Sequence, residues 1–113
     1  MAKTKHPDPL SRRHLLEREI EPSKASAIAK AYLDEGREIE AIDFFAKLED
    51  RGALEKIQSV AVERGDVFLM KAASAGLGEE PSAERWKKLG ERAGELGRVR
   101  DAESAQRLAS IDA

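Results

Sequence analysis

The chain has 113 residues, of which 20 are basic and 22 acidic, a net charge of −2 and no cysteine. The lack of cysteine excludes disulfides and thiolate metal sites, and the balanced charge lacks the basic excess typical of nucleic-acid-binding proteins. Hydrophobic residues make up 41% of the chain but aromatic residues only 4%, and the Ala/Leu/Glu/Lys/Arg-rich alphabet predicts an all-α domain. No apolar run is long enough for a secretory signal or a membrane span, so we expect a soluble, cytoplasmic protein with no membrane contact.

The N-terminal segment is expected to be an arm followed by a short helix. Residues 1–9 contain two prolines and two lysines, which predicts a flexible arm. The leading helix is expected at residues 11–21, with Ser11 as its N-cap. Leu10 and Leu15 are placed to form a hydrophobic staple, in which the residue before the cap packs on the fourth helical position.

Three helical hairpins are expected to follow, at residues 23–50, 53–75 and 82–110. Pro22 is expected to end the leading helix, because proline disfavours helical geometry in the residue before it. With the leading helix, the hairpins make residues 10–113 a single helical-repeat domain of about seven helices. A glycine lies at the turn inside each hairpin, where the left-handed conformation is needed: Gly36, Gly65 and Gly97.

The remaining boundaries depend on cap and turn residues. Ser23, Asp66 and Ser82 are expected to cap the helices that follow them, because their side-chain oxygens can accept from free backbone N–H groups. Gly52 is expected to separate the first two hairpins, and residues 76–81 are expected to be a loop.

Two of the hairpins share a pattern of small and large residues. The first reads Ala29-x-Ala31-Tyr32-x3-Gly36-x4-Ala41-x3-Phe45, and the third reads Trp86-x2-Leu89-Gly90-x2-Ala93-x3-Gly97-x4-Ala102. This pattern resembles the tetratricopeptide-repeat family from about residue 23 to residue 110. The resemblance implies antiparallel hairpins stacked as an α-α superhelix, in which small residues let helices approach and large ones fill the gaps.

The middle hairpin departs from the family pattern. Gln58 occupies a slot for a small residue, Met70 occupies an alanine slot, and in the first hairpin Ala25 stands where the tryptophan usually lies. A related helical-hairpin solenoid or an irregular helical bundle therefore stays open as an alternative. In either case the aromatic side chains at helical spacing are expected in the core.

In tetratricopeptide domains the first helices of successive hairpins line a concave groove that binds peptides or other proteins. The resemblance places these residues in such a groove: Ser26, Lys30, Leu33, Asp34, Glu55, Ser59, Val62, Glu63, Lys87, Glu91, Gly94 and Glu95. Five carboxylates against two lysines favour a basic or apolar partner segment. The chain has no asparagine, so the family's asparagine-and-lysine clamp for a carboxylate terminus cannot be built.

No constellation of residues indicates catalysis or a cofactor. The two histidines are His6 in the arm and His14 on the leading helix, and neither has a paired nucleophile or base nearby in sequence. The glutamate pairs are typical of solvated helix faces rather than metal sites. We therefore expect a non-enzymatic protein-protein interaction module or adaptor, which needs no metal or cofactor.

Two other functions are open. A self-associating structural protein could dimerise through Leu15 and Ile20 or through Leu108 and Ile111. A regulatory protein could contact nucleic acid through a basic N-terminal cluster, which comprises Lys3, Lys5, Arg12, Arg13 and His14. This cluster lacks interleaved aromatic residues, and a solvated terminus explains it better.

Overall fold

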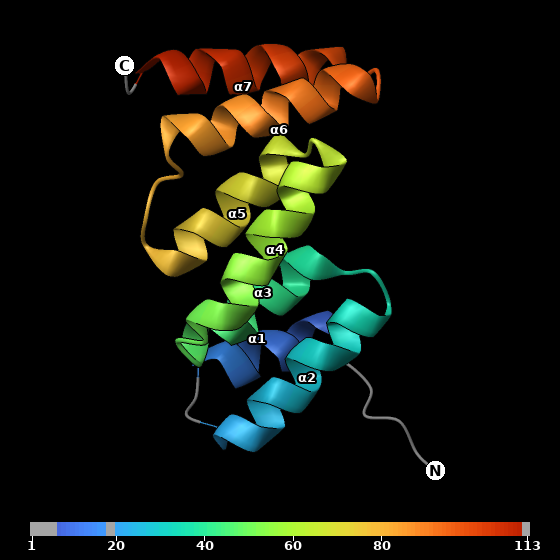
Figure 1. Ribbon diagram of the computed structural model, residues 1–113. Helices are drawn as coiled ribbons and strands as arrows, with labels where there is room; N and C mark the ends of the chain where they lie inside the picture. The colour runs from blue at the N-terminus through green and yellow to red at the C-terminus, as the bar shows by residue number, and fades with distance from the viewer. Residues whose placement is uncertain (1–6, 18–19, 112–113) are drawn as a thin grey trace.

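A computed structural model describes residues 7–17 and 20–111. This part of the chain forms seven helices along an elongated body of 44 × 26 × 23 Å (Figure 1). The helices are α1 (Pro9–Glu17), α2 (Pro22–Asp34), α3 (Glu38–Lys47), α4 (Arg51–Arg64), α5 (Val67–Leu77), α6 (Ala83–Glu95) and α7 (Val99–Ile111). The all-α prediction is confirmed, since no strand occurs in the described residues.

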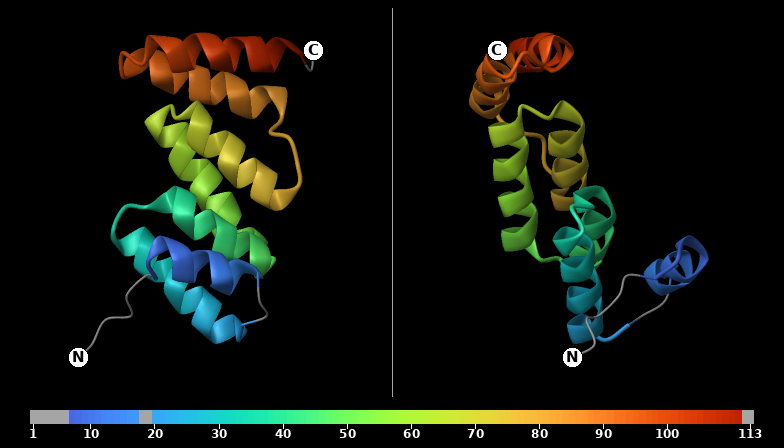
Figure 2. Two further views of the ribbon diagram at one scale, coloured as in Figure 1. Left: turned by 180° about the vertical axis from the view of Figure 1, so that it is seen from behind. Right: turned by 90° about the vertical axis from the view of Figure 1, so that its right-hand side faces the viewer.

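The helices pair as three hairpins in chain order. The first hairpin is α2–α3, the second is α4–α5 and the third is α6–α7, and the helices of each pair pack against one another. Figure 2 shows the hairpins succeeding one another along the long axis of the molecule, with α7 at one end and α1 and α2 toward the other. Stacked helical hairpins are therefore the architecture of the chain.

The start of α1 differs from the sequence prediction. Asp8, not Ser11, caps the helix: its Oδ1 accepts from the backbone N–H of Ser11 at 2.9 Å, and Pro9 takes the first helical position. Proline suits this position because its missing N–H would have no intrahelical partner there. Leu10 is 69% exposed, so the predicted Leu10 staple is wrong. Of the predicted arm, residues 1–6 lie outside the described residues.

The boundary between α1 and α2 is also earlier than predicted. In the described residues α1 ends at Glu17, and positions 20 and 21 are not helical. Glu21 has φ −58° and ψ 134°, the extended geometry that a following proline imposes. Pro22 occupies the first turn of α2, and Ser23 therefore lies inside this helix rather than capping it.

Two further turns differ from expectation, and two caps agree with it. Glu49, with φ 56°, makes the left-handed turn between α3 and α4, so Gly52 falls inside α4. Helix α5 continues to Leu77, with Gly78 as its C-cap, so the loop begins two residues later than predicted. Asp66 and Ser82 cap α5 and α6 as predicted, each accepting from a backbone N–H three residues later.

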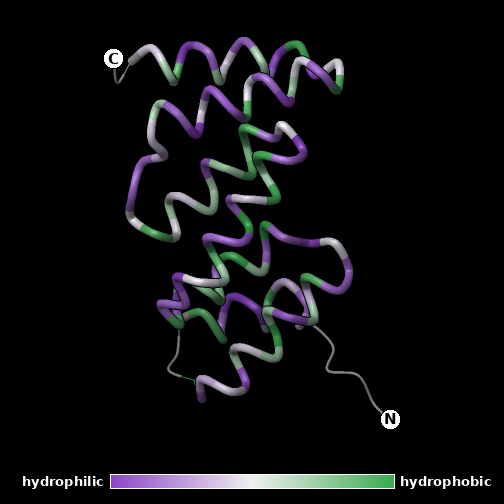
Figure 3. The backbone as a smooth tube through the Cα atoms, in the orientation of Figure 1, coloured by the Kyte–Doolittle hydropathy of each residue, from purple (hydrophilic) through white to green (hydrophobic). Residues whose placement is uncertain are grey.

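The core runs through all three hairpins and is built mostly from small and aliphatic side chains. In Figure 3 hydrophobic positions alternate with hydrophilic ones along the helices. The largest fully buried side chains are Tyr32, Phe44, Leu54, Met70 and Leu89. Trp86 and Phe45 are also buried, which confirms their expected place in the core.

The two junctions between hairpins use different helices. At the first junction α3, the second helix of its hairpin, packs against both α4 and α5. At the second junction α4 packs along α6, which pairs the first helices of the two hairpins. The stack therefore places α4 and α6 side by side, whereas the main neighbour of α2 is α3.

Candidate functional site

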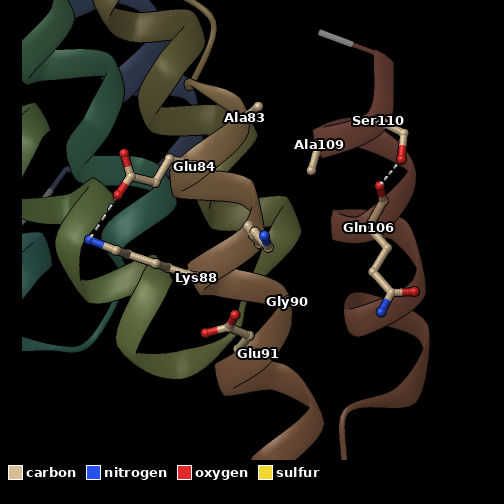
Figure 4. A pocket seen from close by; sticks show the side chains of 9 residues that line it. Ala83, Glu84, Lys88, Gly90, Glu91, Gln106, Ala109 and Ser110 are labelled. Carbon is tan, nitrogen blue, oxygen red and sulfur yellow. Dashed lines mark hydrogen bonds and ion pairs between the residues drawn. The ribbon is translucent and has the colours of Figure 1, made fainter. Parts of the chain in front are cut away.

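A hollow of about 1020 Å³ opens between α6 and α7, on the last hairpin of the stack. Figure 4 shows the two helices and the side chains around the hollow. Those from α6 are Ala83, Glu84, Lys87, Lys88, Gly90 and Glu91, and those from α7 are Gln106, Ala109 and Ser110. Ala83 and Ala109 point into the gap between the helices, so small side chains face one another across it.

The sequence of α6 explains why this face is free. Trp86, Leu89 and Ala93 recur at helical spacing and are buried, so they form the apolar face of α6 within the molecule. Lys87 and Glu91 lie one turn apart on the charged side and are exposed. The helix therefore uses one face for the core and presents the other to the hollow.

The floor of the hollow depends on the absence of a side chain at Gly90. A Cβ at this position would lie 3.2 Å from the Cβ of Ala105 and 3.6 Å from the carbonyl oxygen of Ala102. Ala105 is fully buried. The small residues thus hold α6 and α7 close together here, and the hollow lies above this contact.

The polar side chains around the hollow make few hydrogen bonds or ion pairs with the described residues. Lys88 Nζ lies 3.7 Å from Glu84 Oε1, and Ser110 Oγ donates to the carbonyl oxygen of Gln106 at 2.9 Å. The side-chain amide of Gln106 forms no hydrogen bond with the residues that the structure describes. It can therefore donate to and accept from a bound molecule.

The residues of the predicted groove lie on three helices that do not form one line. Lys87, Glu91, Gly94 and Glu95 are on α6, next to α4, which carries Glu55, Ser59, Val62 and Glu63. Ser26, Lys30, Leu33 and Asp34 are on α2, which packs on α3 instead. All of these side chains are at least partly exposed. Lys87 and Glu91 are the two that line the hollow.

The sequence pattern already marked Gly90 and Ala102 as small residues that let the helices approach, but it missed the polar residues that α7 brings to the hollow. Gln106 and Ser110 were expected only as parts of the third hairpin, because they match no motif. No local sequence motif marks them, because the hollow arises from the way α6 and α7 pack together.

A buried polar network joins the second and third hairpins next to this site. Gln58 is 5% exposed and Ser74 is 4% exposed, and Gln58 Nε2 donates to Ser74 Oγ at 3.0 Å. Arg85 of α6 donates to Gln58 Oε1. Gln58, which departs from the repeat pattern, therefore forms hydrogen bonds at this position, and the buried side chains of Gln58 and Ser74 each have a partner.

A cationic cluster around Tyr32 holds α1 on the first hairpin. Arg12 of α1 lies 5.8 Å from the centre of the Tyr32 ring, donates to the carbonyl oxygen of Glu40 at 3.2 Å and pairs with Asp43. Arg37 lies 5.2 Å from the same ring. Burial raises the pKa of Tyr32, and the two guanidinium groups oppose this rise. Arg12 thus serves docking within the molecule.

The structure adds no support for a nucleic-acid contact at the basic N-terminal cluster. Lys3, Lys5 and His6 lie outside the described residues, and Arg12 is engaged with the first hairpin. Within the described part of the chain, no cluster of three or more histidine or acidic side chains could hold a metal ion. Nor does any helix in that part have the length and apolar character needed to cross a bilayer.

Comparison with known proteins adds no relative. No protein-family model, no curated protein and no solved structure matches the chain.

Proposed function

We propose that the chain is a non-enzymatic interaction module that binds a helix of a partner protein in the hollow between α6 and α7. One observation carries this proposal: the hollow of about 1020 Å³ lies on the outer face of the last hairpin, between two helices floored by small residues. A partner helix fits a groove between two helices when small residues at the contact allow close approach. Around that floor, charged and amide groups can fix orientation.

The nearest precedent is in the molecule itself. Helix α6 lies along α4 and brings Arg85 to Gln58, so the second hairpin already carries a helix on its outer face. The third hairpin has the same two-helix form, and its outer face carries the hollow. A partner helix would continue the stack by one element, in the manner of tetratricopeptide-like repeats.

The test uses a displayed library of helical peptides selected on the immobilised full chain. Selected peptides should bind the wild type and lose at least tenfold in affinity for Ala109→Trp, which fills the hollow without changing charge. Ser59→Trp is the matched control, since Ser59 is exposed on α4 and lies outside the hollow. Peptides that bind Ala109→Trp as tightly as the wild type, or a selection that yields no binder, would refute the proposal.

The control also separates the hollow from the groove expected from the repeat resemblance. Loss of binding to Ser59→Trp but not to Ala109→Trp would assign recognition to the side of α4 and α6 that carries Ser59, Glu55 and Glu63. Self-association is checked on the same samples by light scattering. A dimer that Ala109→Trp dissociates would identify a second copy of the chain as the occupant.

A further inference from the structure

The second and third hairpins correspond residue by residue. Helix α4 begins at Arg51 and α6 at Ala83, 32 positions later, and α5 and α7 begin at Val67 and Val99 with the same shift. The turn glycines keep this spacing as well, with φ 62° at Gly65 and φ 75° at Gly97. A point on one hairpin can therefore be matched to a point on the other.

The second hairpin is contacted by α6 at two such points. At the first, Gln58, which donates to Ser74, accepts a hydrogen bond from the guanidinium of Arg85. At the second, Gly65 lies directly against α6: a Cβ there would be 2.5 Å from the Cα of Ala93. Ala93 lies eight positions after Arg85, so the two points are about 12 Å apart along the helix.

Both points have open counterparts on the third hairpin. Gln58 and Ser74 correspond to Gly90 and Gln106, which line the hollow. The glutamine is therefore on the first helix of the second hairpin and on the second helix of the third hairpin, at the same level along the pair. Gly65 corresponds to Gly97, and nothing lies within 4 Å of a Cβ built there. The third hairpin therefore keeps an amide at one point and an uncovered glycine turn at the other.

A third contact lies between these two points. Arg92 Nε donates to the backbone carbonyl oxygen of Glu63, near the end of α4, at 2.9 Å. The corresponding carbonyl on α6 is that of Glu95. It lies in the last turn, where carbonyl oxygens have no backbone N–H donor within the helix. A donor seven residues after the first arginine would reach it, since positions seven apart share one helix face.

We infer that the partner helix binds in the register that α6 adopts on the second hairpin, with a basic face toward the hollow. An arginine in its first turn donates to the Gln106 amide oxygen, and a second arginine, seven residues later, donates to the Glu95 carbonyl. An alanine or glycine, eight residues after the first arginine, packs on Gly97. The occupant is thus an arginine-bearing amphipathic helix, and this inference rests on the proposed function.

The charges around the hollow accommodate such a helix. Glu91 lies on α6 between the two points and has no ion pair with any described residue. Glu84 is paired with Lys88 at 3.7 Å, so these two residues together contribute no net charge. Lys87 is the remaining cation, and it disfavours any further positive side chain between the two arginines of the partner helix.

The experiment measures anisotropy of labelled synthetic peptides on an alanine-rich helical background. The probe carries arginine, a second arginine seven residues later and alanine eight residues after the first, which are the spacings of Arg85, Arg92 and Ala93. Replacing its first arginine by glutamate should weaken binding to the full chain about tenfold or more, because a hydrogen bond to a charged group is lost. Replacing its alanine by leucine should weaken binding similarly, through the clash at the glycine turn.

Protein variants test the contact from the other side. Gln106→Leu should remove the difference between the arginine and glutamate probes, and Gln106→Glu should enlarge it, while both variants fold because Gln106 is exposed. Equal binding of the two probes to wild type, or no effect of Gln106→Leu, overturns the inference. Library peptides that still require an open hollow at Ala109 would then leave the proposed function standing, so the two failures are distinguishable.

Discussion

Replacing Gly65 by alanine should be among the most damaging single-methyl changes that the chain can undergo. The residue has φ 62°, a left-handed conformation that costs an L-residue about 1–2 kcal/mol. Because Gly65 joins α4 to α5, the strain falls on the turn of the second hairpin. This first contribution is the same for any turn glycine with positive φ.

The second contribution comes from α6 and is specific to Gly65. A Cβ there would lie 2.5 Å from the Cα and 2.7 Å from the backbone nitrogen of Ala93, which is fully buried. These are backbone atoms, so no rotamer change can relieve the contact and α6 must move. Overpacking of this kind costs about 1–3 kcal/mol, which brings the expected loss for Gly65→Ala to about 2–5 kcal/mol. That is a large part of the stability of a small domain.

Urea unfolding followed by tryptophan fluorescence measures the loss directly. Trp86 is the single tryptophan, is 2% exposed and lies on α6, so its emission reports the helix that must move. Gly36→Ala and Gly97→Ala are matched controls, with φ 73° and 75° and nothing within 4 Å of the added methyl. They should lose only the strain of about 1–2 kcal/mol.

The stabilities of Gly65→Ala and Gly97→Ala, compared with each other, test the contact between Gly65 and Ala93. A Gly65→Ala protein no less stable than Gly97→Ala would refute the close contact with Ala93. A further check is the double variant Gly65→Ala/Ala93→Gly. It removes the Cβ of Ala93, which would lie 2.8 Å away, but keeps the closer backbone atoms, so it should not recover the lost stability.

Three further predictions concern the polar contacts between elements. Gln58→Leu leaves the Arg85 guanidinium without its buried acceptor and should lower the free energy of unfolding by about 1–3 kcal/mol in urea; an unchanged midpoint would contradict the network. Arg12→Ala should speed hydrogen exchange of the α1 amides without affecting those of the third hairpin, whereas equal protection in both proteins would show that other contacts hold α1. The backbone N–H of Ser11 lowers the pKa of Asp8, so the stabilisation from this cap is complete above the ordinary carboxyl value of about 4 and is lost as the pH falls through the lower folded value. Asp8→Asn, which can still cap, should remove that acid-dependent part of the loss of α1 protection, and an unchanged pH profile would refute its origin in Asp8.

The helices and turns set by local chemistry could be predicted from the sequence. Gly36, Gly65 and Gly97 all have positive φ, as expected for residues that end a helix and begin a sharp turn. The caps at Asp66 and Ser82 were also predictable, because their acceptor and donor lie three residues apart in the chain. These features depend on a few neighbouring residues and need no knowledge of the fold.

Local signals failed where two of them competed. Asp8 and Ser11 can both cap a helix, and Asp8 prevails because Pro9 after it suits the first helical position. At the next turn Glu49 takes the left-handed conformation although Gly52 is nearby, because α4 begins at Arg51 under the cap of Asp50. A short motif shows that a residue can cap a helix or make a turn, but not which of two neighbouring candidates is used.

The stacking of hairpins was predicted, but which helices pack together at each junction was not, because that depends on contacts between distant residues. The repeat pattern treats Gln58 as a poor fit to a small-residue slot, yet its hydrogen bonds to Ser74 and Arg85 occupy the second junction. The pattern also implies that first helices pack together throughout, whereas α3 makes the first junction. The residues of the expected groove are therefore divided between α2 and the α4–α6 pair, and the hollow on the last hairpin had no sequence signal.

The two ends of the stack differ in a way that bears on where a partner binds. Helical stacks need terminal elements with a polar outer face, because an uncovered hairpin leaves its contact surface in water. At one end α1 lies on α3 through Arg12 and Lys47, whose ammonium donates to the Leu16 carbonyl at 2.9 Å. At the other end no described residue covers the hollow between α6 and α7. A helix bound there would add one element to the stack, so its binding should raise the unfolding midpoint of the third hairpin more than that of the first.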